Sequence, residues 1–334
     1  MGCHGCFANA RCVQYRGGRG MEAIELHYES HDGVSDIRAL LWQRDAASCE
    51  APRGIVQIVH GMSEHVERYA PFASFLVSKG FVVCANDHVG HGKSASDKES
   101  LGHMPLRNGA EVLMEDVHEL RKMMQGRYGE EVPFVMFGHS MGSFVTRCYL
   151  TRYAKGLAAA VLCGTGQQPR ALSRVGNAVC HILAAFKGER YCSAFVDSLG
   201  AGAFSKAISD ARTEVDWIST DPEVVDAYRA DSACGQMFTL GAYASLTALA
   251  LEATDPKRAR LIPKGLPLLF IAGGEDPVGN CGKGVERAAE QYRAAGILCV
   301  DMKLYDGMRH EILNEPVKEE VFNDVDRWLR SKGI

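Results

Sequence analysis

The stretch PFVMFGHSMG, residues 133–142, decides the fold. Its apolar first half leads into the pentapeptide GHSMG, and a helical stretch, SFVTRCYLTRYA, follows. The pattern G-x-S-x-G between a strand and a helix is typical of a sharp turn that presents a nucleophilic serine. Gly138 and Gly142 must be small, because side chains there would clash with the neighbouring strand and helix. The motif therefore predicts Ser140 as a nucleophile at a helix N-terminus, where the dipole favours developing negative charge.

Apolar runs alternate with helical stretches along most of the chain, which predicts a parallel sheet covered by helices. Residues 23–45 form two extended segments around Asp32-Gly33, a hairpin signal that predicts an antiparallel entry into the sheet. The buried strands expected after it are residues 54–61, 81–88, 133–140, 158–165, 266–276 and 300–307. Expected helices include residues 70–79, 113–127 and 317–331. We therefore predict an α/β fold with a mostly parallel sheet of eight strands and helices on both faces.

The interval between residues 165 and 264 breaks this alternation and is too long for one crossover helix. It contains apolar helical candidates at residues 175–186 and 236–253. Because ligands of open α/β sheets bind at the carboxyl ends of the strands, we interpret the interval as an inserted helical cap over the site. The two helices either line an acyl tunnel or only seal the cap onto the catalytic domain. The predicted organisation is a disordered leader (1–21), a catalytic core (22–165 and 261–334) and the cap (166–260).

The composition of the 334-residue chain, 46% hydrophobic and 23% charged, is ordinary for a soluble globular protein. A net charge of -4 without a run of Lys and Arg argues against nucleic-acid binding. No stretch of about 18 apolar residues predicts a membrane-spanning helix. The 12 cysteines lack a disulfide spacing and several lie in apolar runs. We therefore predict free thiols and a reducing, cytoplasmic compartment.

A loop that follows the apolar run IVQIV begins with His60, Gly61 and Met62. Where a G-x-S-x-G serine acts, this loop supplies one backbone N–H to the oxyanion, and the residue after the nucleophile supplies the other. The predicted oxyanion donors are therefore the main-chain N–H groups of Met62 and Met141. Gly61 lets the backbone bend close to the substrate.

The other members of a triad are expected in the chain order serine, acid, histidine. Asp276 follows the apolar run LPLLFIAGG, and the spacing to Pro277 favours it over its rival Glu275. His310 follows the last expected strand, and no other histidine comes after Asp276. We predict that His310 takes the proton from Ser140 and that Asp276 fixes the orientation of the imidazole.

Metal binding is not expected. Cys3 and Cys6 have the spacing of half a zinc site, but the second half is missing. None of the histidines near the strand ends has a ligand spacing such as H-E-x-x-H, so most of them should have structural hydrogen bonds. These histidines are His60, His65, His88, His91 and His139. We predict no metal and no organic cofactor.

Five motifs in order carry a resemblance to a known family: HGMSEHVERYAPFASFL, NDHVGHGKS, GHSMGS, AGGEDPVG and YDGMRHEILNE. Together they resemble the monoacylglycerol lipase and lysophospholipase-like group of α/β hydrolases, which is grouped with serine aminopeptidase-like hydrolases. The resemblance covers roughly residue 22 to the C-terminus, and it implies the α/β-hydrolase fold and the triad above. One departure is Val89, which stands where the family pattern D-x-R-G-H-G-x-S has Arg.

The resemblance also implies residues that contact the substrate. In monoacylglycerol lipases a Glu and an Arg downstream of the His-Gly pair help to hold the glycerol head, and those positions match Glu64 and Arg68. A structural ion pair between these two residues is an equal alternative. His139, beside the nucleophile, is a third candidate for substrate contact. The cap matches the family least, although it sets the acyl-chain length and the head group.

The first functional hypothesis is hydrolysis of carboxylic esters of monoacyl lipids, either monoacylglycerols or lysophospholipids, through an acyl-enzyme. An alternative on the same triad is an aminopeptidase or a small-ester carboxylesterase. An aminopeptidase needs acidic groups for the α-amine, but the cap acids Asp216, Asp221, Glu223 and Asp226 read as solvated helix ends. A remote alternative is a non-catalytic binding module, which a lost triad member would indicate. The acyl substrate predicts transient contact of the cap with membrane surfaces and no obligate protein partner.

Overall fold

Nine strands form one sheet in the part of the chain that the structure describes. The computed structural model describes residues 13–16, 21–44, 51–209 and 211–334. In chain order the strands are β1 (Val13–Arg16), β2 (Met21–Glu29), β3 (Asp36–Arg44), β4 (Gly54–Val59), β5 (Phe81–Asn86), β6 (Phe134–His139), β7 (Ala159–Cys163), β8 (Leu268–Gly273) and β9 (Val300–Tyr305). Across the sheet their order is β1-β2-β3-β5-β4-β6-β7-β8-β9. Only β1 and β3 run against the others, so the sheet is mostly parallel, as predicted.

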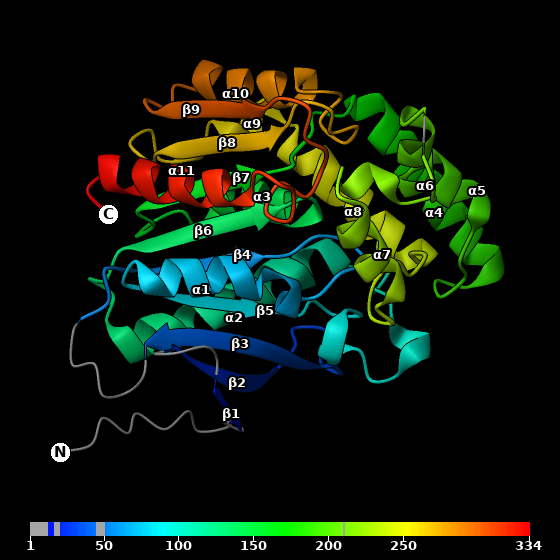
Figure 1. Cartoon of the computed structure of the whole chain (residues 1–334). Coiled ribbons are helices and arrows are strands. Elements are labelled where there is room, and N and C mark those ends of the chain that lie inside the picture. The colour runs from blue at the N-terminus through cyan, green and yellow to red at the C-terminus, as the bar shows by residue number, and fades with distance from the viewer. Residues whose placement is uncertain (1–12, 17–20, 45–50, 210) are drawn as a thin grey trace.

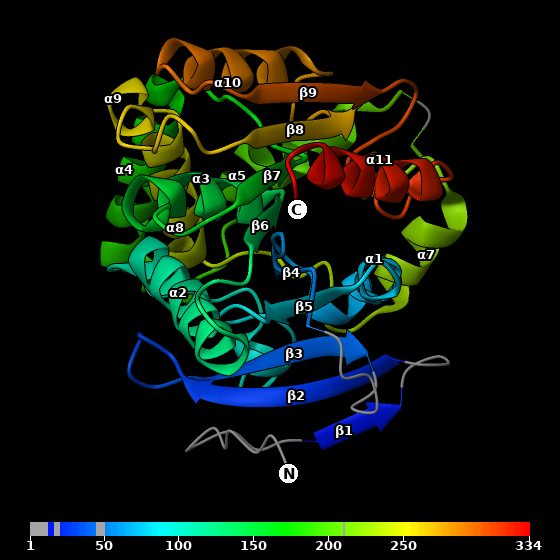
Figure 2. The ribbon, with the colours of Figure 1, turned by 90° about the vertical axis from the view of Figure 1, so that its left-hand side faces the viewer.

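Helices cover both faces of this sheet (Figure 2). They are α1 (Ala70–Ser78), α2 (Gly109–Tyr128), α3 (Met141–Tyr153), α4 (Arg170–Lys187), α5 (Ala194–Leu199), α6 (Ala201–Phe204), α7 (Pro222–Ala230), α8 (Leu240–Ala253), α9 (Pro256–Ala259), α10 (Lys283–Ala294) and α11 (Lys318–Ser331). Short 3₁₀ turns are η1 (Val66–Tyr69), η2 (Gly92–Ser94), η3 (Lys98–Ser100), η4 (Ser205–Ala207) and η5 (Asp216–Ile218). Side chains of α1 and α11 share one core with the strands. Those of α2, α3, α8 and α10 share the core on the other face.

The eight predicted strands are present, and β1 is a ninth. It lies within the segment predicted to be a disordered leader, but residues 13–16 pair antiparallel with β2. Cys3 and Cys6 lie outside the described residues. The expected hairpin joins β2 to β3: Gly33 has a φ of 75°, and the Asp32 carboxylate accepts the N–H of Ser35 at 2.7 Å. The positive φ explains why glycine stands in this turn.

The segment between β7 and β8 supplies the helices beyond the carboxyl ends of the parallel strands (Figure 1). α4, α5, α6 and α7 lie at that end of the molecule. α8 differs, because it packs against α2 and α3 as well as α4. It therefore belongs to the layer that covers the sheet, and we propose that residues 166–239 make up the cap over the site. None of the helices in the described ranges is long and apolar enough to cross a membrane.

Three buried histidines connect the ends of β4 and β5. The Nε2 atom of His60 accepts the main-chain N–H of His88 at 3.0 Å, and its Nδ1 atom lies 2.8 Å from the carbonyl of Gly61. This pair of contacts requires a neutral imidazole with the proton on Nδ1. The ring of His60 lies 4.2 Å from that of His88 and 5.3 Å from that of His91. Burial lowers the pKa of His88 to about 3 and that of His91 to about 4.

These histidines predict a loss of stability in mild acid. The folded protein keeps the His91 imidazole neutral down to about pH 4, whereas the unfolded chain protonates it below about pH 6.5. The unfolded state therefore binds more protons between these values, and the free energy of unfolding falls as the pH falls. We expect His91→Gln to reduce the slope of the free energy of unfolding against pH by up to about 1.4 kcal/mol per pH unit. Urea denaturation at a series of pH values measures it. The control is His31→Gln at an exposed position, and equal slopes for the two variants would contradict the prediction.

Candidate active site

The predicted nucleophile lies in a strained turn between β6 and α3. Ser140 has φ 55° and ψ -121°, a conformation that side-chain-bearing residues rarely adopt outside functional sites. A Cβ at Gly138 would lie 2.4 Å from the hydroxyl of Thr146, and one at Gly142 would lie 1.9 Å from the carbonyl of Val59. Both glycines are therefore required by packing, which agrees with the G-x-S-x-G prediction. The turn places Ser140 at the N-terminus of α3.

The predicted acid and base are in direct contact. Asp276 lies after β8 and is fully buried, and its Oδ2 atom is 2.9 Å from Nδ1 of His310. Its other oxygen accepts the N–H of Val278 at 2.9 Å. The rival acid Glu275 is exposed. The structure thus pairs His310 with Asp276, so that Nδ1 carries the proton and Nε2 can act as a base.

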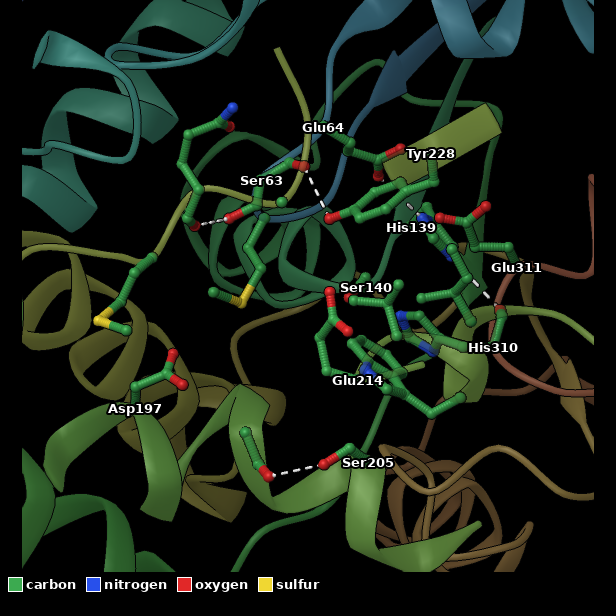
Figure 3. A pocket seen from close by; sticks show the side chains of 18 residues that line it. Ser63, Glu64, His139, Ser140, Asp197, Ser205, Glu214, Tyr228, His310 and Glu311 are labelled. Atoms are coloured by element: carbon green, nitrogen blue, oxygen red, sulfur yellow. Dashed lines mark hydrogen bonds and ion pairs between the residues drawn. The ribbon is translucent and has the colours of Figure 1, made fainter. Parts of the chain in front are cut away.

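Ser140 and His310 line the same pocket (Figure 3). Among the described residues, Nε2 of His310 is a buried atom without a hydrogen-bond partner. No hydrogen bond joins it to the Ser140 hydroxyl within the described ranges, and such bonds often tighten only when substrate is bound. An unpartnered buried nitrogen beside the predicted nucleophile is what a general base needs before substrate binds.

The predicted oxyanion donors lie at the same end of the sheet. Within the described ranges, the main-chain N–H groups of Met62 and Met141 have no protein acceptor. A Cβ at Gly61 would lie 3.0 Å from Cβ of Ser140 and 2.6 Å from the Glu64 carboxylate. The loop after β4 therefore approaches the serine so closely that only glycine fits at position 61.

Glu64 and Arg68 belong to a buried network behind this loop. The Oε1 atom of Glu64 accepts the N–H of Gly61 at 2.6 Å and the hydroxyl of Tyr69 at 2.8 Å. The same oxygen lies 3.2 Å from Nδ1 of His139. Arg68 donates to the other oxygen of Glu64 at 3.0 Å. Glu64 therefore holds the backbone of the predicted oxyanion loop.

The charges of this network are balanced inside the protein. Burial raises the pKa of a carboxyl, but His139 and Arg68 outweigh it and hold the pKa of Glu64 well below its usual value. Burial opposes protonation of His139, but the Glu64 carboxylate outweighs it and raises the pKa of His139. Arg68 also makes two hydrogen bonds to Glu311, at 2.7 and 2.6 Å. These contacts favour the structural ion pair over a head-group role for Glu64 and Arg68, and the substrate contact of His139 stays a prediction.

We expect Glu64→Gln to distinguish these two roles. If Glu64 is structural, the variant unfolds more easily by roughly 3–5 kcal/mol, because a buried charge network is broken. Its kcat then falls on every ester, by about tenfold or more, because the Gly61 loop loses its carboxylate acceptor. A rise in KM restricted to monoacylglycerols would instead support head-group binding. Tyr69→Phe removes a donor from the same carboxylate and keeps its charge, so a smaller effect on both quantities is expected. Chemical denaturation and steady-state kinetics measure them.

The cap contributes contacts that sequence reasoning missed. The turn η5 is bound to the loop that carries His310: the N–H of His310 donates to the carbonyl of Trp217 at 3.4 Å, and the N–H of Glu311 donates to Ile218 at 2.7 Å. The ring of Trp217 lies 5.1 Å from that of His310. Gly164, after β7, has a φ of 58°, and a Cβ there would lie 3.0 Å from the His310 ring. No local motif marks these residues, since their roles come from packing against His310.

The pocket has a volume of about 250 Å³ and lies between the strand ends and the cap. Its lining includes Ser140 and His310 from the loops at the strand ends and Trp217 and Tyr228 from the cap. The carboxylates of Asp197 and Glu214 also line it (Figure 3). The cap acids Asp216, Asp221 and Asp226, which the sequence offered for an α-amine, do not line this pocket. Asp216 accepts the backbone N–H of Arg212, Asp221 caps α7, and Asp226 pairs with Arg212. Asp197 and Glu214 were therefore not found from the sequence.

Comparisons with known proteins agree with this geometry. Residues 50–317 match the family described as serine aminopeptidase S33. The chain is 30% identical over 310 residues to a monoacylglycerol lipase of Mycolicibacterium smegmatis, and the match covers 90% of this chain and 96% of that relative. It is 25% identical to the monoglyceride lipase of Homo sapiens, with 84% of each chain covered. The crystal structure of a highly thermostable carboxyl esterase from Bacillus coagulans, in complex with glycerol, has a TM-score of 0.84 and 31% identity, covering 93% of this chain and 99% of that one. The chain therefore belongs to the serine aminopeptidase S33 family, has the α/β-hydrolase fold, and is a carboxylic ester hydrolase.

Proposed function

We propose that this enzyme hydrolyses carboxylic esters of monoacyl lipids through a triad of Ser140, Asp276 and His310. The observation that carries the proposal is the arrangement of the last two residues. Asp276 holds Nδ1 of His310 at 2.9 Å, and Nε2 has no hydrogen-bond partner among the described residues in the pocket that contains Ser140. A buried histidine with one nitrogen held by a carboxylate and the other free is suited to activate a serine hydroxyl.

The reaction follows from these positions. The Oγ atom of Ser140 attacks the ester carbonyl carbon while its proton moves to Nε2 of His310. The oxyanion accepts hydrogen bonds from the N–H groups of Met62 and Met141. His310 then gives its proton to the departing alcohol, and an acyl-enzyme remains. A water molecule that loses a proton to His310 attacks the acyl-enzyme. The bond between the acyl carbon and Oγ of Ser140 then breaks, His310 returns the proton to Oγ, and the carboxylic acid leaves.

The choice of a monoacyl lipid rests on the relatives and on the pocket. The two lipase relatives are named monoacylglycerol lipase and monoglyceride lipase. The cavity of about 250 Å³ lies below the roughly 300–1,000 Å³ of pockets for drug-sized ligands. A glycerol head with a short acyl chain therefore suits a pocket of this volume, and a long acyl chain would extend beyond it. α8 packs against α2 and α3. This packing favours the interpretation that α8 seals the cap onto the catalytic domain over the interpretation that it lines an acyl tunnel.

A specific observation supports a second candidate function, an aminopeptidase on the same triad. The side chains of Asp197 and Glu214 line the pocket, and carboxylates of this kind are suited to hold a substrate α-amine. Asp197 already accepts the hydroxyl of Tyr243 at 2.5 Å, and Glu214 is exposed and lies 3.5 Å from Arg229. Both carboxylates thus have partners in the protein, which favours the ester substrate.

Hydrolysis of a substrate panel tests the proposal. The panel contains monoacylglycerols and lysophosphatidylcholines of several chain lengths, short p-nitrophenyl esters and aminoacyl p-nitroanilides. Preference for monoacyl lipids supports the proposal, and the preferred head group identifies the substrate. Preference for anilides would support the aminopeptidase. Absence of turnover together with absence of fluorophosphonate labelling at Ser140 would contradict the proposal and support the non-catalytic binding module.

We further propose that the cap contacts membrane surfaces transiently through α4. The residues on its outer face are exposed to solvent by more than half of their surface and follow the spacing of one helical stripe. They are Leu172, Val175, Ile182 and Phe186. The opposite face, with Cys180 and Ala184, packs toward α8. An apolar stripe without a partner is suited to a lipid interface.

We expect Phe186→Asp to weaken binding to phosphatidylcholine vesicles by about tenfold or more, because an exposed phenyl group no longer enters the lipid. Hydrolysis of a short, water-soluble ester should be unchanged. Vesicle sedimentation measures binding, and Val34→Asp, an exposed apolar residue in the β2–β3 hairpin, is the control. Equal binding by both variants and the wild type would contradict a role of the α4 stripe.

The compartment stays a prediction. The cysteines in the described ranges are free thiols, and Cys84, Cys148 and Cys163 are among the buried ones. Free buried thiols agree with a reducing cytoplasmic environment.

A further inference from the structure

His65, Asp231 and Cys234 meet where the cap contacts the loop after β4. Asp231 is the C-cap residue that follows α7, and Cys234 lies in the turn after it. Nε2 of His65 lies 2.8 Å from Oδ2 of Asp231. One possible ligand atom of each of the three residues lies within 4.8 Å of the others. His65 and Cys234 are buried, and Asp231 is half-buried.

These three donors suit a zinc ion. Zn²⁺ takes sulfur, imidazole nitrogen and carboxylate oxygen, and three protein ligands leave its fourth tetrahedral position for water. The thiolate of Cys234 and the carboxylate of Asp231 would together neutralise the charge of the ion. These two residues have the D-x-x-C spacing, and the N–H of Cys234 donates to the carbonyl of Asp231 at 3.0 Å. Two ligands three positions apart on one turn is also the spacing of the C-x-x-C half of zinc sites.

The surroundings of the three residues are compatible with a cation. A carboxylate oxygen of Glu67 lies 3.7 Å from Nδ1 of His65, on the far side of the ring from Asp231. Histidines that bind a metal usually donate their other N–H to a carboxylate, which fixes the ring. At 3.7 Å Glu67 is not hydrogen-bonded to His65, and it would have to approach Nδ1 to take this role. Burial raises the pKa of the Cys234 thiol, and Arg68, a cation that opposes this rise, has its guanidinium paired with Glu64 and Glu311. The positive charge near the site is therefore already balanced.

We propose that His65, Asp231 and Cys234 bind a Zn²⁺ ion that ties the cap to the predicted oxyanion loop. The same two segments are joined at Ser63, whose carbonyl accepts the hydroxyl of Tyr228 and the N–H of Gly235, both at 2.9 Å. A bound ion would add a strong link at His65, three residues from Met62, and so restrain the cap against this loop. The site lies outside the catalytic machinery, and the proposal does not depend on which ester is hydrolysed.

Zinc binding to the full chain tests the proposal. Cys3, Cys6 and Cys12 are replaced by serine in every sample, because these thiols are possible ligands of their own. Equilibrium dialysis is expected to show one tightly bound Zn²⁺ per chain, and Co²⁺ is expected to give a thiolate-to-metal absorption band. Cys234→Ser should abolish both signals. Cys281→Ser, at an exposed free thiol, is the matched control and should change neither.

A graded variant and a second ligand make the test decisive. Glu67→Gln leaves the three ligands in place, and we expect it to weaken Zn²⁺ binding about 10–100-fold. Zn²⁺ should raise the Tm of the chain that keeps His65, Asp231 and Cys234, and should not raise the Tm of Cys234→Ser in the same background. If Cys234→Ser does not fold, His65→Gln takes its place in every measurement. Absence of stoichiometric binding, or equal affinity in the wild type and the ligand variants, overturns the proposal. Because Zn²⁺ can also inhibit through His310, activity is not used as the readout.

Discussion

Replacing Ser140 by alanine is expected to lower kcat for ester hydrolysis by roughly 10⁶-fold. The variant loses the oxygen atom that we propose forms the acyl-enzyme, and His310 then has no hydroxyl to activate. The fold should be intact, because alanine removes one hydroxyl and adds no atom to the turn between β6 and α3. Hydrolysis of a p-nitrophenyl ester measures kcat, and mass spectrometry after fluorophosphonate treatment measures labelling.

The matched control is Ser205→Ala, the same change in the same pocket. The hydroxyl of Ser205 donates to the carbonyl of Gly202 at 3.1 Å, and this bond joins two residues of the cap. We expect this variant to keep most of its kcat and to be labelled like the wild type. A Ser140→Ala enzyme that kept more than a small fraction of the activity would show that the nucleophile is another residue.

Asp276→Asn should lower kcat by roughly 10⁴-fold. The carboxylate accepts from Nδ1 of His310 at 2.9 Å and from the N–H of Val278. An amide at this position can present its NH₂ group to His310, which then carries its proton on Nε2 and cannot accept one from Ser140. The loss should be in kcat rather than in KM, because Asp276 is fully buried behind His310.

Glu275→Gln separates the two acids that the sequence offers. Its side chain is exposed, and its main-chain N–H donates to the carbonyl of Met308 at 2.9 Å, a bond that the substitution keeps. We expect its kcat to be close to that of the wild type. A large loss in Glu275→Gln together with an active Asp276→Asn would mean that the acid is wrongly assigned.

The sequence alone determined the fold and the residues proposed for the triad. Local patterns suffice for this, since apolar runs of strand length and the G-x-S-x-G turn depend on neighbouring residues. Parallel strands bring their carboxyl ends to one edge of the sheet, so residues that follow strands meet there without further information. Asp276 and His310 follow β8 and β9, and the contact between them is 2.9 Å. The eight predicted strands are present for the same reason.

The edges of the fold were less predictable. The ninth strand, β1, is short and lies in a segment without an apolar run, so nothing local distinguished it from a leader. α8 was assigned to the cap because it is apolar and lies in the long interval, but apolar periodicity does not say which surface a helix covers. Its packing against α2 and α3 places it in the layer on the sheet.

Only the tertiary structure decided what surrounds the predicted nucleophile. Glu64 could hold either a substrate or the protein, and its contacts with Gly61 and His139 appear only when the loop after β4 folds over β6. The cap brings Trp217 beside His310, and it brings Asp231 to within 2.8 Å of His65, which is 166 positions away. Contacts between such distant segments leave no period or spacing in the sequence, because their geometry is set by how the cap packs on the sheet.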